Sequence, residues 1–514
     1  MDVVTLGAAK ADAKRKITAA RQTQVDFGRL TAPPVAGRTF RPTGFANLTG
    51  NTFRRVYVLQ EDTTKIRLVY TNLCMNGGGE ASLGTYTISA ARVWFEGAAA
   101  IGIPVTFAGA TTIDVLPFQT VVSDPISVSY GTVKGAAFAV DTYITHGAGT
   151  YLPRDANGYS VIQGIAEGYG AGDVTANNSN FANFTTHSAS FGPTAIVGWG
   201  ANGHQTTAIL GDSIAFGSGY GVAAGNSSFL MDGLDNNGVG GLNLALAGET
   251  LALVLDFKKT KYRLNAAQGC VNVISEYGIN DLTGGASLAS MKSMYLQWWG
   301  LLAKRFKGVF QTTIGPHTAS TDNWRTVANQ SLNTEEATRQ AVNQWLRAPA
   351  SAGPGNSAIL DAAGTLTAVY DTAKNAECNA NGSAITINAS TGAISNGTGG
   401  RFPVDATTYL TGTATSSSAQ ALTDTTQAWT SQQWAGYYVH ITADATTPAS
   451  VGQVRSISTT EPTILRLDSA WTTSPSAGAT YAIRKLPTID GLHPSTWIHR
   501  AMATGVDATK LLRA

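Results

Sequence analysis

The sequence predicts an α/β protein whose core is a parallel sheet with helices on both faces, accompanied by two β-rich units. Three observations predict this class. Apolar strands alternate with helical segments over residues 195–372, short β-type runs separated by Gly, Pro and Asn fill residues 41–194, and helical signals vanish over residues 373–486. A chain of 514 residues is long enough for several domains.

Composition and charge argue against several classes of function. Charged residues make up 13% of the chain, and the formal net charge is +2, so we expect no broad basic surface for nucleic acid or anionic membrane. The three cysteines, Cys74, Cys270 and Cys378, are too few and too distant for a disulfide framework. No run of about 18 apolar residues is present, so we expect no membrane insertion. The first residues also lack the apolar run of a secretory signal.

Residues 1–40 form the first predicted unit. Up to about residue 30, alanines are interleaved with lysines and arginines, which predicts a helix. One interpretation is a solvated terminus. The other is a docking segment for a larger assembly, because the opening resembles those of phage and prophage tail proteins.

Residues 41–194 are predicted to form a β-sandwich domain. The β-type runs include Lys65–Tyr70 (KIRLVY), Ala91–Phe95 (ARVWF) and Ile126–Tyr130 (ISVSY), each bounded by turn residues. Such short strands at regular spacing are typical of two packed antiparallel sheets.

The core is predicted in two parts, residues 195–372 and 487–514. Its expected strands include Ala208–Leu210, Val271–Ser275, Val309–Thr313 and Ile359–Asp361, and Met291–Phe306 is its clearest predicted helix. Open parallel sheets bind ligands at the carboxyl ends of their strands, so that edge is where a site is expected.

Residues 373–486 are predicted to be a small β module inserted into the core. The segment is rich in Thr, Ser, Gly, Ala and Asn. Its aromatic residues have two interpretations, the core of a small β-sandwich or a surface that stacks on sugars. They include Trp429, Trp434, Tyr437 and Trp471.

The first segment with chemical meaning is Ala208–Gly217, AILGDSIAFG, where a short apolar strand runs into Gly-Asp-Ser. By itself this tripeptide is also a common helix cap or turn. The segment resembles the first conserved block of the SGNH (GDSL-type) serine hydrolases, in which a serine at the end of the first core strand begins a helix. The resemblance implies that Ser213 is the nucleophile and that its own N–H faces an oxyanion.

Two further segments resemble the second and third blocks of that family. Asn243–Leu251, NLALAGETL, matches through Gly248, and Tyr277–Asp281, YGIND, matches through Asn280. The resemblance implies that the Gly248 N–H and the Asn280 amide join the Ser213 N–H in an oxyanion hole. The alternative interpretations are a turn glycine and an Asn-Asp cap.

The fourth segment is Asp490-Gly-Leu-His493-Pro, which matches the family's Asp-x-x-His block. A serine hydroxyl needs a base to remove its proton, and histidine acts as that base near neutral pH when a carboxylate orients it. Three residues of separation in one loop let Asp490 reach His493. The resemblance therefore implies a triad of Ser213, His493 and Asp490.

The resemblance covers residues 195–370 and 487–512. It implies a three-layer α/β/α SGNH hydrolase core, and a serine esterase mechanism through an acyl-enzyme that needs no cofactor. No metal site is indicated, because the cysteines lack zinc spacing and no His-Glu-x-x-His is present. The Gly-rich stretches match neither the P-loop nor the dinucleotide pattern.

The expected function is removal of O-acetyl or other small acyl groups from a polysaccharide. The resemblance of residues 1–40 and 373–486 to phage tail proteins predicts a tail component, located in the virion or outside the cell and assembled as a homotrimer. One alternative is a lipase or lysophospholipase-type esterase. The other is a structural or receptor-binding tail protein that has lost catalysis.

Overall fold

The structure, a computed structural model, describes most of the chain. It covers residues 36–37, 44–60, 62–76, 79–81, 84–95, 102–128, 134–148, 150–154, 161–162, 165–176, 191–200, 206–220, 228–256, 259–267, 269–349, 351, 358 and 365–511. The predicted helical segment 1–40 lies outside the described residues, except for the short strand β1 (Ala36–Gly37). None of the described helices is long and apolar enough to cross a lipid bilayer.

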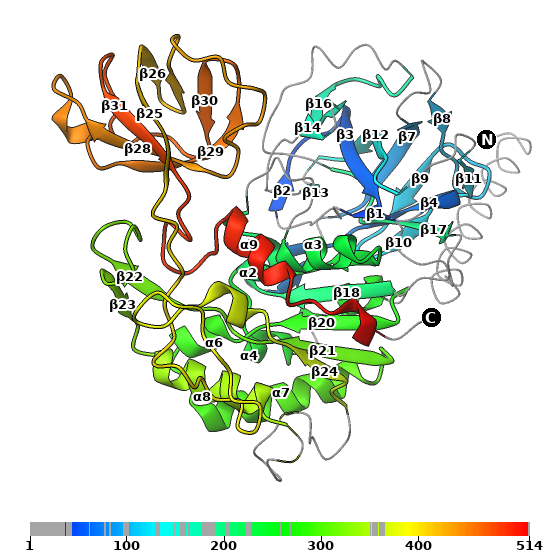
Figure 1. The fold of residues 1–514 in the computed structure, drawn as a ribbon. Coiled ribbons are helices and arrows are strands. Elements are labelled where there is room, and N and C mark those ends of the chain that lie inside the picture. Colours follow the sequence, from blue (N-terminus) through cyan, green and yellow to red (C-terminus); the bar gives the residue numbers. More distant parts are fainter. Residues whose placement is uncertain are drawn as a thin grey trace, which may run out of the picture.

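The predicted mixed α/β class with a parallel sheet is confirmed. Five strands pair in parallel in the order β19-β18-β20-β21-β24 (Figure 1). Their bounds are β18 (Thr206–Gly211), β19 (Gly240–Asn243), β20 (Asn272–Glu276), β21 (Gly308–Thr312) and β24 (Ala368–Tyr370). The strand expected at 359–361 lies outside the described residues, and β24 forms the edge of the described sheet.

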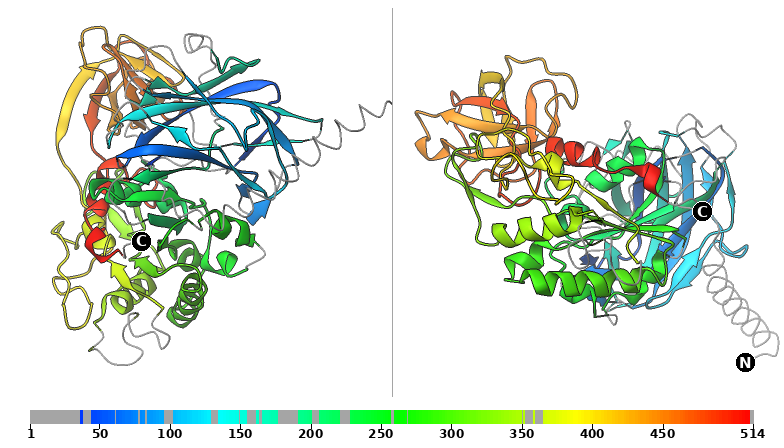
Figure 2. Two further views of the ribbon diagram at one scale, coloured as in Figure 1. Left: turned by 90° about the vertical axis from the view of Figure 1, so that its right-hand side faces the viewer. Right: turned by 60° about the horizontal axis from the view of Figure 1, so that its bottom comes forward.

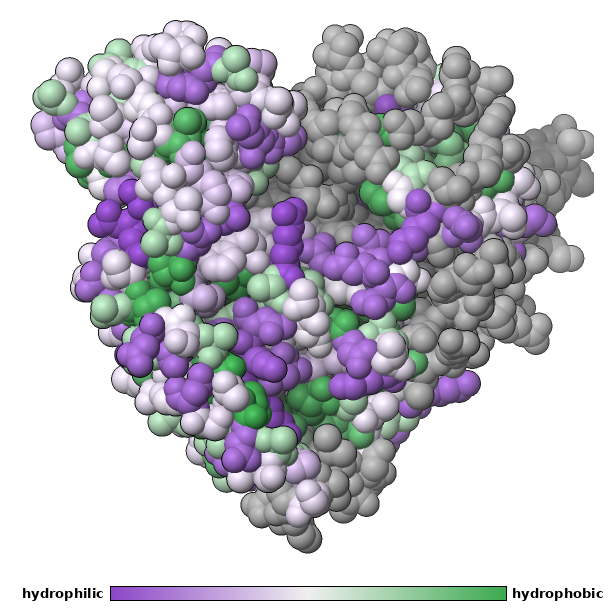
Figure 3. Space-filling model, viewed as in Figure 1, coloured by the Kyte–Doolittle hydropathy of each residue, from purple (hydrophilic) through white to green (hydrophobic). Residues whose placement is uncertain are grey.

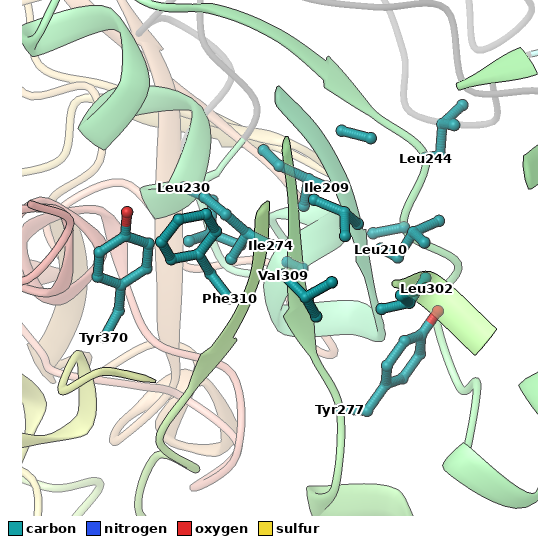
Figure 4. Packing of buried hydrophobic residues seen from close by; sticks show 14 of the residues in the cluster. Ile209, Leu210, Leu230, Leu244, Ile274, Tyr277, Leu302, Val309, Phe310 and Tyr370 are labelled. Carbon is teal, nitrogen blue, oxygen red and sulfur yellow. The ribbon is translucent and has the colours of Figure 1, made fainter. Parts of the chain in front are cut away.

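Continuous apolar runs explain why these strands lie in the middle of the core. All six residues of β18 and all five of β21 are buried, as expected for parallel strands covered on both faces. Ile209, Ile274 and Phe310 occupy matching positions on three neighbouring strands. Figure 4 shows their side chains in one cluster, with Tyr370 stacked on Phe310 at 5.2 Å between ring centroids.

Helices lie on both sides of this sheet (Figure 1). Helices α3 (Phe229–Asn236) and α9 (Thr496–Ala503) lie on one side, and α7 (Leu288–Leu302) and α8 (Glu336–Arg347) on the other. The shorter helices are α2 (Ser213–Phe216), α4 (Leu251–Val254), α5 (Lys261–Ala266) and α6 (Ile279–Thr283).

Helix α7 differs from the predicted span Met291–Phe306. It begins earlier because the Ser287 side chain accepts a hydrogen bond from the Ser290 N–H and caps the first turn. It ends at Leu302, and the chain then turns towards β21. The apolar pattern continues past that turn through Phe306, which is buried in the same cluster. The pattern alone therefore placed the helix end too late.

Two antiparallel sheets precede the core. The larger sheet follows the order β1-β3-β12-β7-β8, and the smaller one the order β10-β4-β11, with β17 also paired to β4. Their bounds are β3 (Asn51–Leu59), β4 (Thr63–Thr71), β7 (Tyr86–Phe95), β8 (Ile103–Pro104), β9 (Ile113–Val115), β10 (Thr120–Val122), β11 (Ile126–Ser127), β12 (Ala137–His146), β16 (Gly168–Ala171) and β17 (Ala195–Gly200). Strands β9 and β16 pair with β7 and β3 at the margins of the larger sheet.

The two sheets share one apolar cluster. Tyr57 and Phe138 from the larger sheet and Leu68 and Tyr70 from the smaller one are all buried in it. A hydrogen bond of 2.9 Å between the hydroxyls of Tyr70 and Thr142 also joins the sheets. The predicted runs at 65–70 and 91–95 lie within β4 and β7, whereas β11 ends at Ser127, short of the expected end at residue 130.

The segment between the core and its last helix contains a seven-stranded antiparallel sheet. Its strands are β25 (Thr408–Thr413), β26 (Ser416–Ser418), β27 (Ala421–Thr423), β28 (Tyr438–Ala443), β29 (Val454–Thr460), β30 (Ile464–Leu467) and β31 (Thr480–Arg484). In Figure 1 and in the left view of Figure 2 this orange module and the blue N-terminal strands both lie above the green core. The chain returns from β31 to the core through the segment that carries Asp490 and His493.

The tryptophans of this module form its interior. Trp429, Trp434 and Trp471 are only 6%, 9% and 6% exposed. They pack in one cluster with Tyr481, so their rings are not available for stacking on a sugar. Figure 3 shows pale, weakly polar residues over most of the visible face of the module, in line with its Ser and Thr content.

Candidate active site

Ser213 lies just beyond the carboxyl end of β18, where it is the first residue of α2. Asp212 caps that helix, since its side chain accepts a hydrogen bond of 2.9 Å from the Ile214 N–H. A side chain at Gly211 would meet the Ala215 Cβ at 2.5 Å, so only glycine lets α2 lie this close to the strand. Ser213 thus begins a tight strand-to-helix turn, as its sequence block suggested.

His493 and Asp490 come from the segment between β31 and α9. The His493 Nε2 lies 2.9 Å from the Ser213 Oγ, and the His493 Nδ1 lies 2.5 Å from the Asp490 Oδ2. A carboxylate at Nδ1 holds the proton there and leaves the Nε2 lone pair facing the serine hydroxyl. The structure therefore brings the three residues into one hydrogen-bonded line.

Asp490 is held as a carboxylate by several donors. Its Oδ1 accepts hydrogen bonds of 2.9 Å from the N–H groups of Leu492 and His493 and one of 3.1 Å from the Thr488 hydroxyl. Burial raises the pKa of Asp490, but the hydrogen bond and positive charge of His493 and these backbone donors outweigh it. They hold the pKa well below its usual range.

A hairpin supports the acid–base segment from behind. Strands β22 (Thr318–Ser320) and β23 (Gln330–Leu332) pair there, and the Thr318 N–H donates to the Gly491 carbonyl at 2.9 Å. Trp324 donates from its indole N–H to the Thr318 hydroxyl at 2.9 Å. Gly491 has a φ of +83°, and a Cβ there would lie 1.8 Å from the Thr318 carbonyl oxygen. Only glycine fits between Asp490 and His493 in this arrangement.

The predicted oxyanion donors lie on neighbouring segments. The Leu246 N–H donates to the Gly211 carbonyl at 2.8 Å, which ties the segment before Gly248 to the end of β18. The Asn280 amide donates to the Glu249 carbonyl at 2.9 Å. Gly248 is exposed, with a φ of +80° and open space around its Cα.

Two backbone donors at this edge are unused. Within the described part of the chain, the N–H groups of Ser213 and Gly248 have no hydrogen-bond acceptor. A side-chain amide carries two N–H donors, and one N–H of Asn280 remains after its bond to Glu249. The edge can therefore offer three donors to an incoming oxygen.

A buried ion pair stabilises the Gly248 segment, and the sequence analysis did not identify it. The Arg263 guanidinium binds both carboxylate oxygens of Glu249 at 2.5 and 2.7 Å, and Tyr277 donates to Glu249 at 2.7 Å. Arg263 also donates to the Leu244 carbonyl at 3.2 Å. In the sequence, Glu249 next to Gly248 was the one signal for this ion pair, because no motif indicates Arg263.

No metal site stands out beside these residues. Across the described ranges, no group of three or more His, Cys, Asp or Glu side chains could hold a metal ion. The residues that meet at the site are a hydroxyl, an imidazole, a carboxylate and amide donors. These are groups that can carry out acyl transfer without a metal.

No protein-family model and no curated protein matches the sequence. Part of the fold does match solved structures. They include an SGNH-hydrolase family esterase, an acetylxylan esterase and a carbohydrate esterase family 2 enzyme.

An SGNH-hydrolase family esterase is 23% identical over 22% of this chain and 60% of its own, with a TM-score of 0.19. An acetylxylan esterase from Geobacillus stearothermophilus is 19% identical over 21% of this chain and 59% of its own, with a TM-score of 0.18. A carbohydrate esterase family 2 enzyme with a carbohydrate-binding domain, from Corynascus thermopiles (Myceliophthora fergusii), is 14% identical over 59% of this chain and 84% of its own, with a TM-score of 0.22.

The matched part spans about three fifths of the length of the first two of these esterases. Their substrates are properties of those proteins. The activity of this chain is inferred below from its own residues.

Proposed function

We propose that the protein is a serine esterase with Ser213 as nucleophile, His493 as general base and Asp490 as the group that orients the base. The observation that carries the proposal is the hydrogen-bonded line from Asp490 through His493 to Ser213, with distances of 2.5 and 2.9 Å. A hydroxyl, an imidazole and a carboxylate in this order form the arrangement that activates serine for acyl transfer.

The reaction proceeds in two steps. In the first, the Ser213 Oγ bonds to the ester carbonyl carbon while its proton moves to the His493 Nε2. His493 then returns that proton to the departing alcohol, and an acyl-Ser213 ester remains. In the second, His493 removes a proton from water, the resulting hydroxide bonds to the acyl carbon, and the free acid leaves as Ser213 regains its proton.

The oxyanion of each tetrahedral intermediate is bound by the N–H groups of Ser213 and Gly248 and by the Asn280 amide. Support for this comes from the two unused backbone N–H groups and from the free N–H of the amide. Losing one such donor costs about 3–4 kcal/mol of transition-state stabilisation.

The architecture behind this function is proposed as a three-layer α/β/α SGNH hydrolase core. It is preceded by a β-sandwich domain and interrupted by a β module. No cofactor takes part in the proposed mechanism.

The proposed substrate is an O-acetylated or otherwise short-chain acylated polysaccharide. The exposed position of the catalytic groups supports a large ester substrate as acyl donor, because the side chains of His493 and Asp490 are 26% and 48% exposed. The tryptophans of the β module give no support, since they are buried. We also propose that the protein is part of a phage tail assembly, that it forms a homotrimer and that it is located in the virion or outside the cell.

The decisive experiment compares hydrolysis of p-nitrophenyl acetate and p-nitrophenyl octanoate by the wild type and by Ser213→Ala. Ser290→Ala, an exposed serine on α7, serves as the matched control. We expect acetate hydrolysis that is lost in Ser213→Ala and retained in Ser290→Ala, followed by acetate release from acetylated glycans.

Other results would change the proposal in defined ways. Faster hydrolysis of the octanoate ester would indicate a lipase-type enzyme. Equal activity of the wild type and Ser213→Ala would exclude this serine as nucleophile. No activity on any ester or glycan would favour a binding or structural protein.

A further inference from the structure

Two acidic side chains are buried directly behind Ser213. Asp212 is 0% exposed and Glu276 is 4% exposed. Asp212 directly follows β18, and Glu276 is the last residue of the neighbouring parallel strand β20, where it is paired with Gly211. In the described part of the chain, neither forms an ion pair with a lysine or arginine. A buried acid without a basic partner is costly, so the pair requires an explanation.

Both carboxyl groups bind the first turn of α2. The Asp212 Oδ1 accepts the Ile214 N–H at 2.9 Å, and the Glu276 Oε2 accepts the Ala215 N–H at 3.1 Å. The Asp212 N–H also donates to the Glu276 carbonyl at 3.1 Å. The turn that begins with Ser213 is therefore held by two side chains, one from the residue that caps it and one from the neighbouring strand β20.

The two carboxyl groups lie next to each other, because they accept the N–H groups of the consecutive residues Ile214 and Ala215. The second oxygen of Asp212, Oδ2, is buried and has no hydrogen-bond partner among the described residues. A proton on Glu276 would supply a donor for this oxygen, whereas two ionised carboxylates have no proton to share.

The surroundings favour one shared proton at neutral pH. Burial raises the pKa of Asp212 to about 7, and burial together with the charge of Asp212 raises the pKa of Glu276 well above its usual range. The neighbouring titratable groups are His493, which favours the ionised form of Asp212, Asp281, which opposes it, and the phenols of Tyr277 and Tyr295. Burial raises the pKa of both phenols, so they stay neutral.

We propose that Asp212 and Glu276 are a proton-sharing pair that holds the first turn of α2 and thereby positions Ser213. This inference rests on the esterase function proposed above. Glu276 keeps the proton and donates it to Asp212, and each acid still accepts one N–H of the turn. When both acids are ionised, like charges face each other in a dry site, and the turn loses its support.

Close packing passes this support on to the nucleophile. A Cβ at position 211 would lie 2.6 Å from the Glu276 carbonyl oxygen, so the end of β18 that leads into Ser213 is packed directly against Glu276. A small shift of Glu276 would therefore move Ser213 relative to His493. Misplacement of reacting groups by about 1 Å costs on the order of a hundredfold in rate. Glu276 is a positioning residue in this scheme, because it acts through the turn.

The shared proton is tested by thermal unfolding between pH 5 and 9 of the wild type, Glu276→Gln and Ser275→Ala. Glutamine can donate to Asp212 and accept the Ala215 N–H, but it cannot ionise. A group with a raised folded pKa loses its contribution to stability as pH rises. We expect the Tm of Glu276→Gln minus that of the wild type to increase by about 3 °C or more between pH 5 and pH 9.

Ser275→Ala is the matched control on the same strand. The Ser275 hydroxyl accepts the Trp298 indole N–H at 3.1 Å, so its removal weakens β20 without changing a titratable group. We expect an offset in Tm that does not vary with pH. A constant difference between Glu276→Gln and the wild type across the range would overturn the proton-sharing pair.

The positioning role is tested by the rate at which a fluorophosphonate probe labels Ser213, and by kcat and KM on p-nitrophenyl acetate. We expect Glu276→Ala to slow labelling and lower kcat by about tenfold to a hundredfold with little change in KM. Glu276→Gln should restore most of this loss at neutral pH. Equal losses in the alanine and glutamine variants would overturn the positioning role.

The two tests keep this inference separate from the proposed function. If the wild type is neither labelled nor active, the esterase proposal and the positioning role fall together. The pH dependence of Tm would still decide whether Asp212 and Glu276 share a proton.

Discussion

The Nε2 of His493 lies 2.9 Å from the Oγ of Ser213 although 280 positions separate the two residues in the chain. The whole seven-stranded β module lies within this separation. The chain leaves the core after β24 and returns to it before α9, where His493 meets the end of β18. The insertion therefore lengthens the chain between base and nucleophile without separating them in space.

Removal of the orienting acid is predicted to abolish most activity while leaving the fold intact. Asp490→Asn keeps the shape of the side chain but favours the wrong tautomer of His493. We expect kcat on p-nitrophenyl acetate to fall by about 10⁴-fold. His146→Ala, which changes a histidine of the N-terminal β-rich region, should retain wild-type kcat. A loss of less than tenfold in Asp490→Asn would argue against its role.

Asn280→Ala is predicted to lower kcat with little effect on KM, because the lost amide acts on the oxyanion of the transition state. The expected decrease is about 10²- to 10³-fold. Thr283→Ala is the matched control on α6, since the Thr283 hydroxyl donates to the Asn280 carbonyl at 3.0 Å and leaves the Asn280 amide unchanged. If steady-state kinetics gave the same decrease for both variants, helix α6 rather than the amide would be responsible.

Gly491→Ala is predicted to displace the acid–base segment. The new Cβ would overlap the Thr318 carbonyl, in addition to the strain of a left-handed residue, which costs about 1–2 kcal/mol. Gly452→Ala provides the control for strain alone, because Gly452 has a φ of +87° and open space around it. We expect esterase activity to fall at least tenfold more in Gly491→Ala than in Gly452→Ala. Similar activities would show that the contact with Thr318 is unimportant.

Removing one partner of the ion pair between Arg263 and Glu249 is predicted to lower the stability of the fold more than removing both. Arg263 and Glu249 are 1% and 0% exposed at their side chains, so Arg263→Met leaves a buried carboxylate without its partner. We expect a loss of about 3–5 kcal/mol in the free energy of unfolding, measured with urea. The double variant Arg263→Met with Glu249→Leu should recover part of it. A double variant less stable than the single one would contradict this explanation.

The pair of Asp490 and His493 is predicted to contribute to stability only above about pH 4, the usual pKa of an aspartate. Asp490 has a depressed pKa in the folded state, so its contribution is present above the unfolded pKa and is lost as pH falls through the folded value. The difference in urea midpoint between the wild type and Asp490→Asn should therefore shrink as the pH falls below about 4. A difference that grows as the pH falls below 4 would contradict this sign.

Local patterns were sufficient to indicate several parts of this molecule. The apolar runs before Ser213 and Asn280 were expected to be parallel strands, and β18 and β20 lie there. The spacing of Asp490 and His493 indicated that one could reach the other, and they are hydrogen-bonded. Their catalytic roles, and that of Gly248, stay predictions that the variants above test.

Other parts could not be predicted because they depend on contacts between distant segments. The aromatic residues of the β module allowed either a core or a sugar surface, and only packing shows that Trp429, Trp434 and Trp471 are buried. The end of α7 was misplaced because Phe306 continues the apolar pattern beyond the helix. An apolar pattern shows which residues are buried, but it does not show whether such a residue lies in the helix or after the turn that ends it.

The sequence by itself determined the mixed α/β class and the identity of the candidate residues, because strand and helix periodicity and short motifs are encoded locally. Only the tertiary structure decided how those residues are supported. The contact of Gly491 with Thr318, the ion pair of Arg263 with Glu249 and the contact of Asp212 with Glu276 all join different segments of the chain. Hydrogen bonds and burial create these relationships only once the sheet has formed, so no single segment carries a signal for them.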